Sequence, residues 1–152
     1  MIRELNNKNM KTAEKILAVQ LPAYKVEADI MNFDGIPQLQ DTVDSIIQSN
    51  ETFVGYMAED ELAGFISYTN DEGLFQICRL VVDPHHFRKG IANSLLGHFL
   101  ENVSKECQIA VTTGSKNVPA KNLYKKYGFF EVKDIEVAPN VFITLLSNQP
   151  SH

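Results

Sequence analysis

Two cationic side chains and a glycine lie between two apolar runs of different period. Arg88, Lys89 and Gly90 follow the run LVV, which Pro84 ends, and precede the run IANSLLGHFL. A strand that leads into a helix here leaves the first N–H groups of the helix without intrahelical partners, at the positive end of its dipole. Because the glycine also lets a ligand touch the backbone, this corner could bind a phosphate group.

The same corner has a plainer interpretation, a solvated basic turn that opens a core helix. It lacks the GxxxxGK[ST] spacing of a P-loop and the GxGxxG spacing of a dinucleotide-binding loop. Both interpretations stay open on these residues alone. A phosphate bound here would therefore be held by a loop of a different type.

A second segment, NVPAKNLYKKYGFF at residues 117–130, follows the pattern N-x-x-A-x-x-x-Y-x-x-x-G-F. With this segment, the chain resembles the GNAT superfamily of N-acetyltransferases. The corner is similar to the pyrophosphate loop of that family, V-x-P-x-x-[Q/R]-x-x-G-x-[G/A], through Val82, Pro84, Gly90 and Ala92. The strong resemblance covers residues 79–130, and the strand hairpin before them is compatible with it.

The resemblance implies acetyl-CoA as co-substrate and no metal. The family's Gln or Arg position is Phe87 in this chain, so Arg88, one place later, is the expected side-chain contact to the pyrophosphate. The backbone of residues 80–82 and the side chain of Asn117 would contact the pantetheine arm. The implied cofactor-binding residues are Leu80, Val81, Val82, Phe87, Arg88, Lys89, Gly90, Ile91, Ala92, Asn117, Ala120 and Tyr124.

The implied reaction is direct attack of a primary amine on the thioester carbonyl in a ternary complex. Tyr124 is similar to the family tyrosine that protonates the thiolate leaving group, and an ordinary tyrosine pKa near 10 keeps it protonated at neutral pH. Its structural alternative is a half-buried aromatic residue on a helix. A backbone N–H of residues 80–82 is the expected donor to the tetrahedral oxyanion.

The general base that must take the proton of the amine is not assigned by the pattern. The candidates are Glu27, Asp29, Asp34, Glu72, Gln76 acting through a water, His85 and His86. Each carboxylate can equally be a solvated surface charge. The two histidines lie where the resemblance places phosphate, and their simpler interpretation is an exposed loop.

The helices and strands that must position these residues can be predicted from the spacing of hydrophobic residues along the chain. A helix with Met10, Ala13, Ile16 and Leu17 near one face is expected to end at Pro22, followed by an irregular segment over residues 23–36. A second helix is expected from Pro37, with the stripe Leu39, Val43, Ile46 and Ile47. A third is indicated by the stripe Ile91, Leu95, Leu96, Phe99, Leu100 and Val103, and a fourth by residues 120–127 before Gly128.

Short runs rich in β-branched and aromatic residues predict the strands. They cover residues 1–5, 51–58, 62–70, 74–82, 108–113, 129–137 and 141–147. The order is β-α-α-β-β-β-α-β-α-β-β, an α/β mixed sheet in which the strands on either side of the third helix should be parallel. The resemblance implies that these two central strands splay apart. We expect one GNAT-like domain over residues 1–147 and a frayed tail over residues 148–152.

Composition narrows the class of protein. The chain has 152 residues and a formal net charge of −5, which argues against general nucleic-acid binding. No apolar run reaches the roughly 20 residues of a membrane helix. The polar start is unlike a signal peptide, and Cys78 and Cys107 lack zinc-type spacing, so a cytoplasmic protein with reduced thiols is expected.

Three functions remain open. The first is an acetyl-CoA-dependent N-acetyltransferase that acts on a small-molecule or peptide amine, as a monomer or homodimer. The second is a non-catalytic acyl-CoA sensor or interaction module, and the third is a plain protein-interaction domain. The retained Tyr124 favours the first.

Overall fold

The described part of the computed structural model, residues 1–149, contains one seven-stranded sheet in the order β1-β2-β3-β4-β5-β7-β6. Only β4 and β5 pair in parallel, and every other neighbouring pair is antiparallel. The strands are β1 Ile2–Leu5, β2 Thr52–Ala58, β3 Glu61–Asp71, β4 Leu74–Val82, β5 Gln108–Gly114, β6 Phe130–Ala138 and β7 Val141–Ser147. The predicted mixed α/β class and the predicted order of elements are confirmed.

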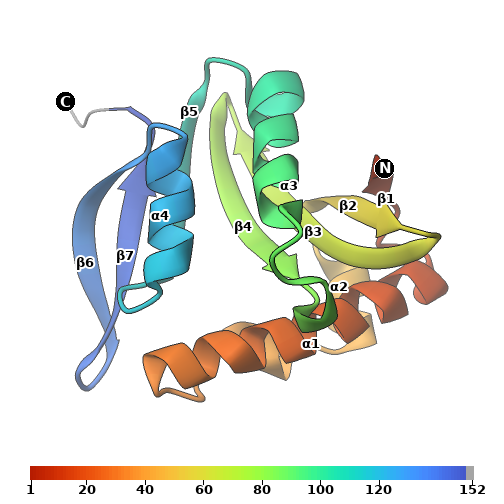
Figure 1. Ribbon diagram of the computed structural model, residues 1–152, viewed down its shortest axis with the longest axis horizontal. Helices are drawn as coiled ribbons and strands as arrows, with labels where there is room; N and C mark the ends of the chain where they lie inside the picture. Colours follow the sequence, from red (N-terminus) through yellow and green to blue (C-terminus); the bar gives the residue numbers. More distant parts are fainter. Residues whose placement is uncertain (150–152) are drawn as a thin grey trace.

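Helices cover both faces of this sheet (Figure 1). They are α1 Met10–Met31, α2 Val43–Gln48, α3 Ile91–Phe99 and α4 Val118–Lys126. Single 3₁₀ turns span Pro37–Gln40 and Pro84–His86, and a wider π-type turn, Leu100–Ser104, continues α3.

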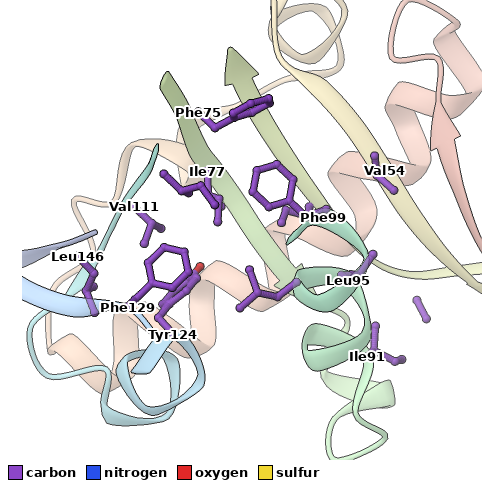
Figure 2. Close-up of a cluster of buried hydrophobic side chains, with 14 residues drawn as sticks. Val54, Phe75, Ile77, Ile91, Leu95, Phe99, Val111, Tyr124, Phe129 and Leu146 are labelled. Atoms are coloured by element: carbon purple, nitrogen blue, oxygen red, sulfur yellow. The ribbon is translucent and has the colours of Figure 1, made fainter. Parts of the chain in front are cut away.

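Alternation along the strands divides the core into two layers. Phe53 and Phe65 point to the α1 and α2 face and are fully buried there, while Val54 and Ile66 point to the α3 face. Figure 2 shows the second layer, in which Phe99 of α3 lies beside the sheet residue Phe75. The two rings meet edge-on, with centroids 5.8 Å apart.

The first helix does not end at Pro22 as predicted, because α1 runs on to Met31 with that proline inside it. A helix-interior proline removes one hydrogen bond and costs about 3 kcal/mol. Tyr24 and Met31, seven positions apart, are buried beyond it, so packing outweighs the cost. Residues 23–36, expected to be irregular, are therefore mostly helical, and Met10, expected on the buried face, is exposed.

The predicted second helix is divided into two pieces. Pro37 opens a 3₁₀ turn as its fixed φ favours, but Thr42 then caps a separate α2. The Thr42 hydroxyl accepts a hydrogen bond from the Ser45 N–H, and the Ser45 hydroxyl accepts one from the Thr42 N–H. This reciprocal cap is the reason for the break.

The side chain of Asn148, which follows β7, holds the end of the described chain against β5 and the residue before it. Asn148 accepts a hydrogen bond from the Ile109 N–H at 2.8 Å and donates one to the Cys107 carbonyl at 3.0 Å. Of the predicted frayed tail, residues 150–152 lie outside the described residues.

Candidate active site

The parallel strands β4 and β5 separate half-way along their length. Their paired residues run from Leu74 and Gln108 to Ile77 and Val111, and the pairing ends there. Beyond that point β4 continues to Val82 and β5 to Gly114, and β5 stays paired with β7 on its other edge from Ala110 to Gly114. The predicted splay of the two central strands is confirmed, and it leaves one backbone edge of β4 open to a ligand.

A β-bulge in β4 coincides with the separation. Ser67 of β3 faces Arg79, but the next residue, Tyr68, faces Ile77, so Cys78 is an extra residue in β4. Bulges bend a strand and increase its twist, and they are common beside active sites. No glycine or proline marks the position in the sequence, so the bulge could not be predicted from it.

Two cavities lie along the opened edge. The first, here called the corner cavity, measures about 390 Å³ and lies between the end of β4, the basic corner, the start of α3 and α4. All of the predicted cofactor-binding residues line it except Lys89 and Asn117. Asn117 instead caps α4 by accepting a hydrogen bond from the Ala120 N–H.

The basic corner presents an open helix end. Gly90 precedes α3 with φ +73°, and Arg88 also has a positive φ, +67°. A Cβ at Gly90 would meet no atom of the described residues within 4 Å, so the space in front of the α3 N-terminus is free. Free N–H groups, an open approach and the Arg88 guanidinium at the cavity wall suit an anion.

The second cavity, here called the gap cavity, measures about 350 Å³ and fills the space between the separated strands. Its walls come from α1, residues 33–38, β4, β5, α4 and the β6–β7 ribbon. Glu27, Leu80, Ala120 and Tyr124 line both cavities. The two cavities therefore meet at a carboxylate and a phenol.

Tyr124 is buried under the sheet beside Phe129, with ring centroids 5.5 Å apart (Figure 2). Burial raises its pKa well above the ordinary tyrosine value, and the negative charge of Glu27 raises it further. Tyr24, which lines the gap cavity, is affected by burial and by Glu27 in the same way. Both phenols are therefore protonated at neutral pH.

Glu27 is the candidate base that the structure brings to the point where the cavities meet. Burial raises the pKa of its carboxyl group, while hydrogen bonds involving the Asn117 side chain and the Gly114 backbone act in the opposite direction. A raised pKa makes a carboxylate a better proton acceptor near neutral pH. Its position depends on α1 continuing past Pro22, which the sequence analysis did not predict.

The other candidate bases lie elsewhere. Five of these candidates are exposed and line neither cavity, namely Asp29, Asp34, Glu72, Gln76 and His85. His86 lines the corner cavity, where its ring nitrogen Nδ1 is 3.3 Å from Lys89 Nζ. His85 is exposed and lies 3.0 Å from the Asp83 carboxylate.

Arg79 forms a buried charged cluster at the gap cavity that the sequence analysis missed. Its Nε and Nη2 each donate to Glu51 at 2.9 Å, and its Nη1 donates to Asp41 and to Gln20 at 2.7 Å. These partners come from α1, from the segment between the 3₁₀ turn and α2, and from the residue before β2. An arginine inside the apolar strand LFQICRLVV was the available signal, since buried charges must be paired.

Along the described part of the chain, no helix combines the length and the apolar character that crossing a membrane requires.

Comparisons by sequence relate the chain to a protein family and to a bacterial protein. The model of a family described as an acetyltransferase (GNAT) domain matches residues 22–143. The UPF0157 protein YqkA of Bacillus subtilis is 40% identical over 150 residues, which make up 99% of this chain and 44% of YqkA. This chain thus spans less than half of the length of that relative.

Comparisons by structure give the same fold at low sequence identity. The ribosomal-protein-S18-alanine N-acetyltransferase from Escherichia coli aligns with 97% of this chain and 91% of its own, at a TM-score of 0.78 and 15% identity. The PaiA N-acetyltransferase from Thermoplasma acidophilum, solved in complex with coenzyme A, aligns with 95% of this chain and 96% of its own, at a TM-score of 0.71 and 20% identity.

Proposed function

The chain belongs to the GNAT family of acetyltransferases, and we propose that it moves the acetyl group of acetyl-CoA directly to a primary amine in a ternary complex. One observation carries this proposal. Glu27 and Tyr124 line both the corner cavity and the gap cavity, at the point where the two meet. A thioester held in one cavity and an amine held in the other would react between a proton acceptor and a proton donor.

The corner cavity is the proposed cofactor site. The pyrophosphate would lie at the α3 N-terminus, near Gly90 and the Arg88 guanidinium, and Lys89 would add positive charge from outside the cavity. The pantetheine arm would follow Leu80–Val82, where β4 has lost its β5 partner. The coenzyme A complex of the structurally similar PaiA supports this assignment, since it shows that the fold can hold this cofactor.

Glu27 is proposed as the general base. A protonated amine cannot attack a thioester, so one proton must leave it first. Burial makes the Glu27 carboxylate a stronger base than an exposed one because it raises the pKa, and hydrogen bonds involving Asn117 and Gly114 act in the opposite direction. The amine nitrogen would then form a bond to the carbonyl carbon, and its lost proton would lie on Glu27.

Tyr124 is proposed as the general acid for the departing thiolate. Part of the rise in its pKa comes from the charge of Glu27. When Glu27 takes a proton, that charge disappears, and Tyr124 becomes a better proton donor at the stage when the carbon–sulfur bond breaks. As the carbon–sulfur bond breaks, the thiolate would take the proton of Tyr124, and the tyrosinate would take the second proton of the amine nitrogen, which leaves a neutral amide, free coenzyme A thiol and a protonated Glu27 that returns its proton to solvent.

The tetrahedral intermediate needs a donor for its oxyanion. The N–H groups of β4 beyond Ile77 that point toward β5 are released from the ladder at the bulge, and they lie beside both cavities. A backbone N–H of residues 80–82 is the proposed donor. We also propose that the protein acts in the cytoplasm, where its two free cysteines would stay reduced.

Release of free coenzyme A thiol from acetyl-CoA tests the proposal when it is measured across a panel of primary amines. We expect release that depends on both substrates. Tight binding of coenzyme A with no release on any amine would identify a cofactor sensor instead. The lack of any thermal shift with coenzyme A would favour a plain interaction domain.

A further inference from the structure

We infer that the acceptor is a small monoamine with an apolar body and no second charged group, received in the gap cavity. This inference rests on the proposed function and adds the chemical class of the acceptor. It follows from which charges line the cavity, which of them are already paired, and how large and apolar the walls are.

Glu27 and Arg79 are the charged residues among the described residues that line the gap cavity. Arg79 is engaged: four of its donor contacts, at 2.7–2.9 Å, go to Glu51, Asp41 and Gln20. The cluster of Arg79 with two carboxylates has a formal charge of +1 − 2 = −1. Glu27 is left as the group that can pair with a charged acceptor.

An acceptor with a carboxylate would find no free cation among the described residues that line this cavity. Its negative charge would face Glu27 and a guanidinium that already has two carboxylates of its own. Burying an unpaired charge is strongly unfavourable. Free amino acids and amino-carboxylates are therefore excluded as good substrates.

An acceptor with two ammonium groups meets the opposite difficulty. Glu27 can receive one of them, at the reacting end. The second would find no free carboxylate among the described residues that line the cavity, because Asp41 and Glu51 are paired with Arg79 and do not line it. Linear diamines and polyamines are excluded for this reason.

The remaining surface of the gap cavity favours an apolar body. Apolar side chains from α1, residues 33–38, β5 and β7 reach it, among them Met31, Phe33, Ile36, Val111 and Ile143. A cavity of about 150 Å³ can hold benzene. The 350 Å³ available here can hold an alkyl or arylalkyl chain as well as the thioester end of the cofactor.

Three amines with the same six-carbon chain test the inference. Hexylamine, 1,6-diaminohexane and 6-aminohexanoate differ only at the end remote from the reacting nitrogen. We expect kcat/KM for hexylamine to exceed that for both charged congeners by roughly 100-fold or more. From butylamine to hexylamine, kcat/KM should rise about fourfold per methylene. Equal or better use of either charged congener, or acetylation of peptide N-termini in preference to hexylamine, would overturn the inference.

A lysine at the rim should change this preference. Val137 of β6 lines the gap cavity and is half-exposed, so Val137→Lys should fold normally. It should raise the ratio of kcat/KM for 6-aminohexanoate to that for hexylamine about fivefold. The matched control is Val132→Lys, on the same strand but outside the cavity lining, which should leave the ratio unchanged. A ratio that Val137→Lys does not raise, or that both variants raise equally, contradicts the inference.

Calorimetric titration separates the inference from the proposed function. The gap cavity is present in the free protein, so the three amines can be titrated into the protein with and without coenzyme A. Tighter binding of hexylamine than of both congeners supports the inference even when no acetyl transfer occurs, in which case only the proposed function fails. Acetyl transfer with no preference for hexylamine retains the proposed function and overturns the inference.

Discussion

The buried carboxyl group of Glu27 lowers the stability of the fold and raises the reactivity of the site, and one substitution can separate the two effects. Because folding raises its pKa, the folded state binds this proton more tightly than the unfolded state does. Stability therefore falls as the pH rises from the ordinary value of 4.5 through the higher folded pKa. Above the folded pKa the ionised carboxylate lowers the stability of the fold, which a neutral group at this position would not do.

Glu27→Gln should for that reason lower activity while it raises stability. We expect kcat/KM to fall about 10²–10⁴-fold if Glu27 is the base, and the free energy of unfolding at pH 7 to rise by about 0.5–2 kcal/mol. Steady-state kinetics and thermal unfolding measure the two effects. Asp29→Asn, an exposed neighbour on α1, is the control and should change neither. Full activity in Glu27→Gln would remove this residue from the reaction.

Tyr124→Phe isolates the proton donor. The change removes one hydroxyl from a buried ring and leaves its packing against Phe129 intact. We expect kcat to fall about 10²–10⁴-fold under conditions in which chemistry limits the rate. Tyr127→Phe is the matched control, because that hydroxyl hydrogen-bonds Asn93 and lines neither cavity. A drop of the same size in both variants would indicate loss of structure in place of loss of a proton donor.

These two residues differ in how far the sequence could predict them. Tyr124 occupies a position in a local pattern, and its neighbours in the chain are also its neighbours in the helix. Glu27 acquires its environment from Asn117 and Tyr124, which are far away in the sequence. The sequence identifies Glu27 only as one of several candidate carboxylates. The folded structure is needed to distinguish Glu27 from Asp29 and Asp34.

At the scale of elements, the basic corner was predictable and the shape of the gap was not. Proline, two cations and a glycine mark the corner in the sequence itself. The gap depends on the bulge at Cys78 and on the helical turns of α1 beyond Pro22. The spacing of Tyr24, Ala28 and Met31 is that of one face of a helix. The prediction nevertheless ended the helix at Pro22, because a proline is unfavourable inside a helix.

Gly90→Val tests the corner as a ligand site. The backbone at Gly90 has φ +73°, so any side chain there is strained by roughly 1–2 kcal/mol, and a valine would also occupy the open space before α3. We expect the Kd for coenzyme A to rise at least tenfold, which isothermal titration measures. Gly73→Val carries a similar strain, at φ +90°, in the turn between β3 and β4, away from both cavities.

That control separates strain from obstruction. Both variants should lose stability to a similar degree, because each places a β-branched residue at a positive φ with open space around it. Only the Gly90 variant should lose affinity for coenzyme A. Wild-type affinity in Gly90→Val would mean that the cofactor does not approach the backbone at this corner.

At the scale of the whole molecule, the Arg79 cluster joins segments that are far apart in the chain. Arg79 in β4 binds Gln20 in α1, Asp41 before α2 and Glu51 before β2. It thereby fixes the helical layer that carries Glu27 to the strand that carries the open edge. No local pattern in the sequence could predict these partners, because each lies at least 28 positions from Arg79.

Burial opposes ionisation of Glu51, but hydrogen bonds from Arg79, Ser67 and Ser49 outweigh it and lower the pKa of Glu51 below 4.5. The folded state therefore favours the ionised carboxylate. This contribution to stability is present above pH 4.5, the ordinary value, and is lost as the pH falls through the lower folded pKa. Acid should thus weaken the link between α1 and the sheet.

Arg79→Met removes the buried cation that the partly buried carboxylates of Asp41 and Glu51 share, and we expect it to lower the free energy of unfolding at pH 7 by up to about 3–5 kcal/mol. The deficit should shrink as the pH falls toward 4, because protonation of Glu51 removes an unpaired charge in the variant, while the wild type loses the stabilisation that its Glu51 ion pair provides. Urea unfolding at a series of pH values measures both effects. Arg3→Met, which removes an exposed arginine of β1, should cost less than about 0.5 kcal/mol at every pH. A deficit for Arg79→Met that is the same at pH 4 and pH 7 would mean that lost packing, and not the charge cluster, holds the helical layer to the sheet.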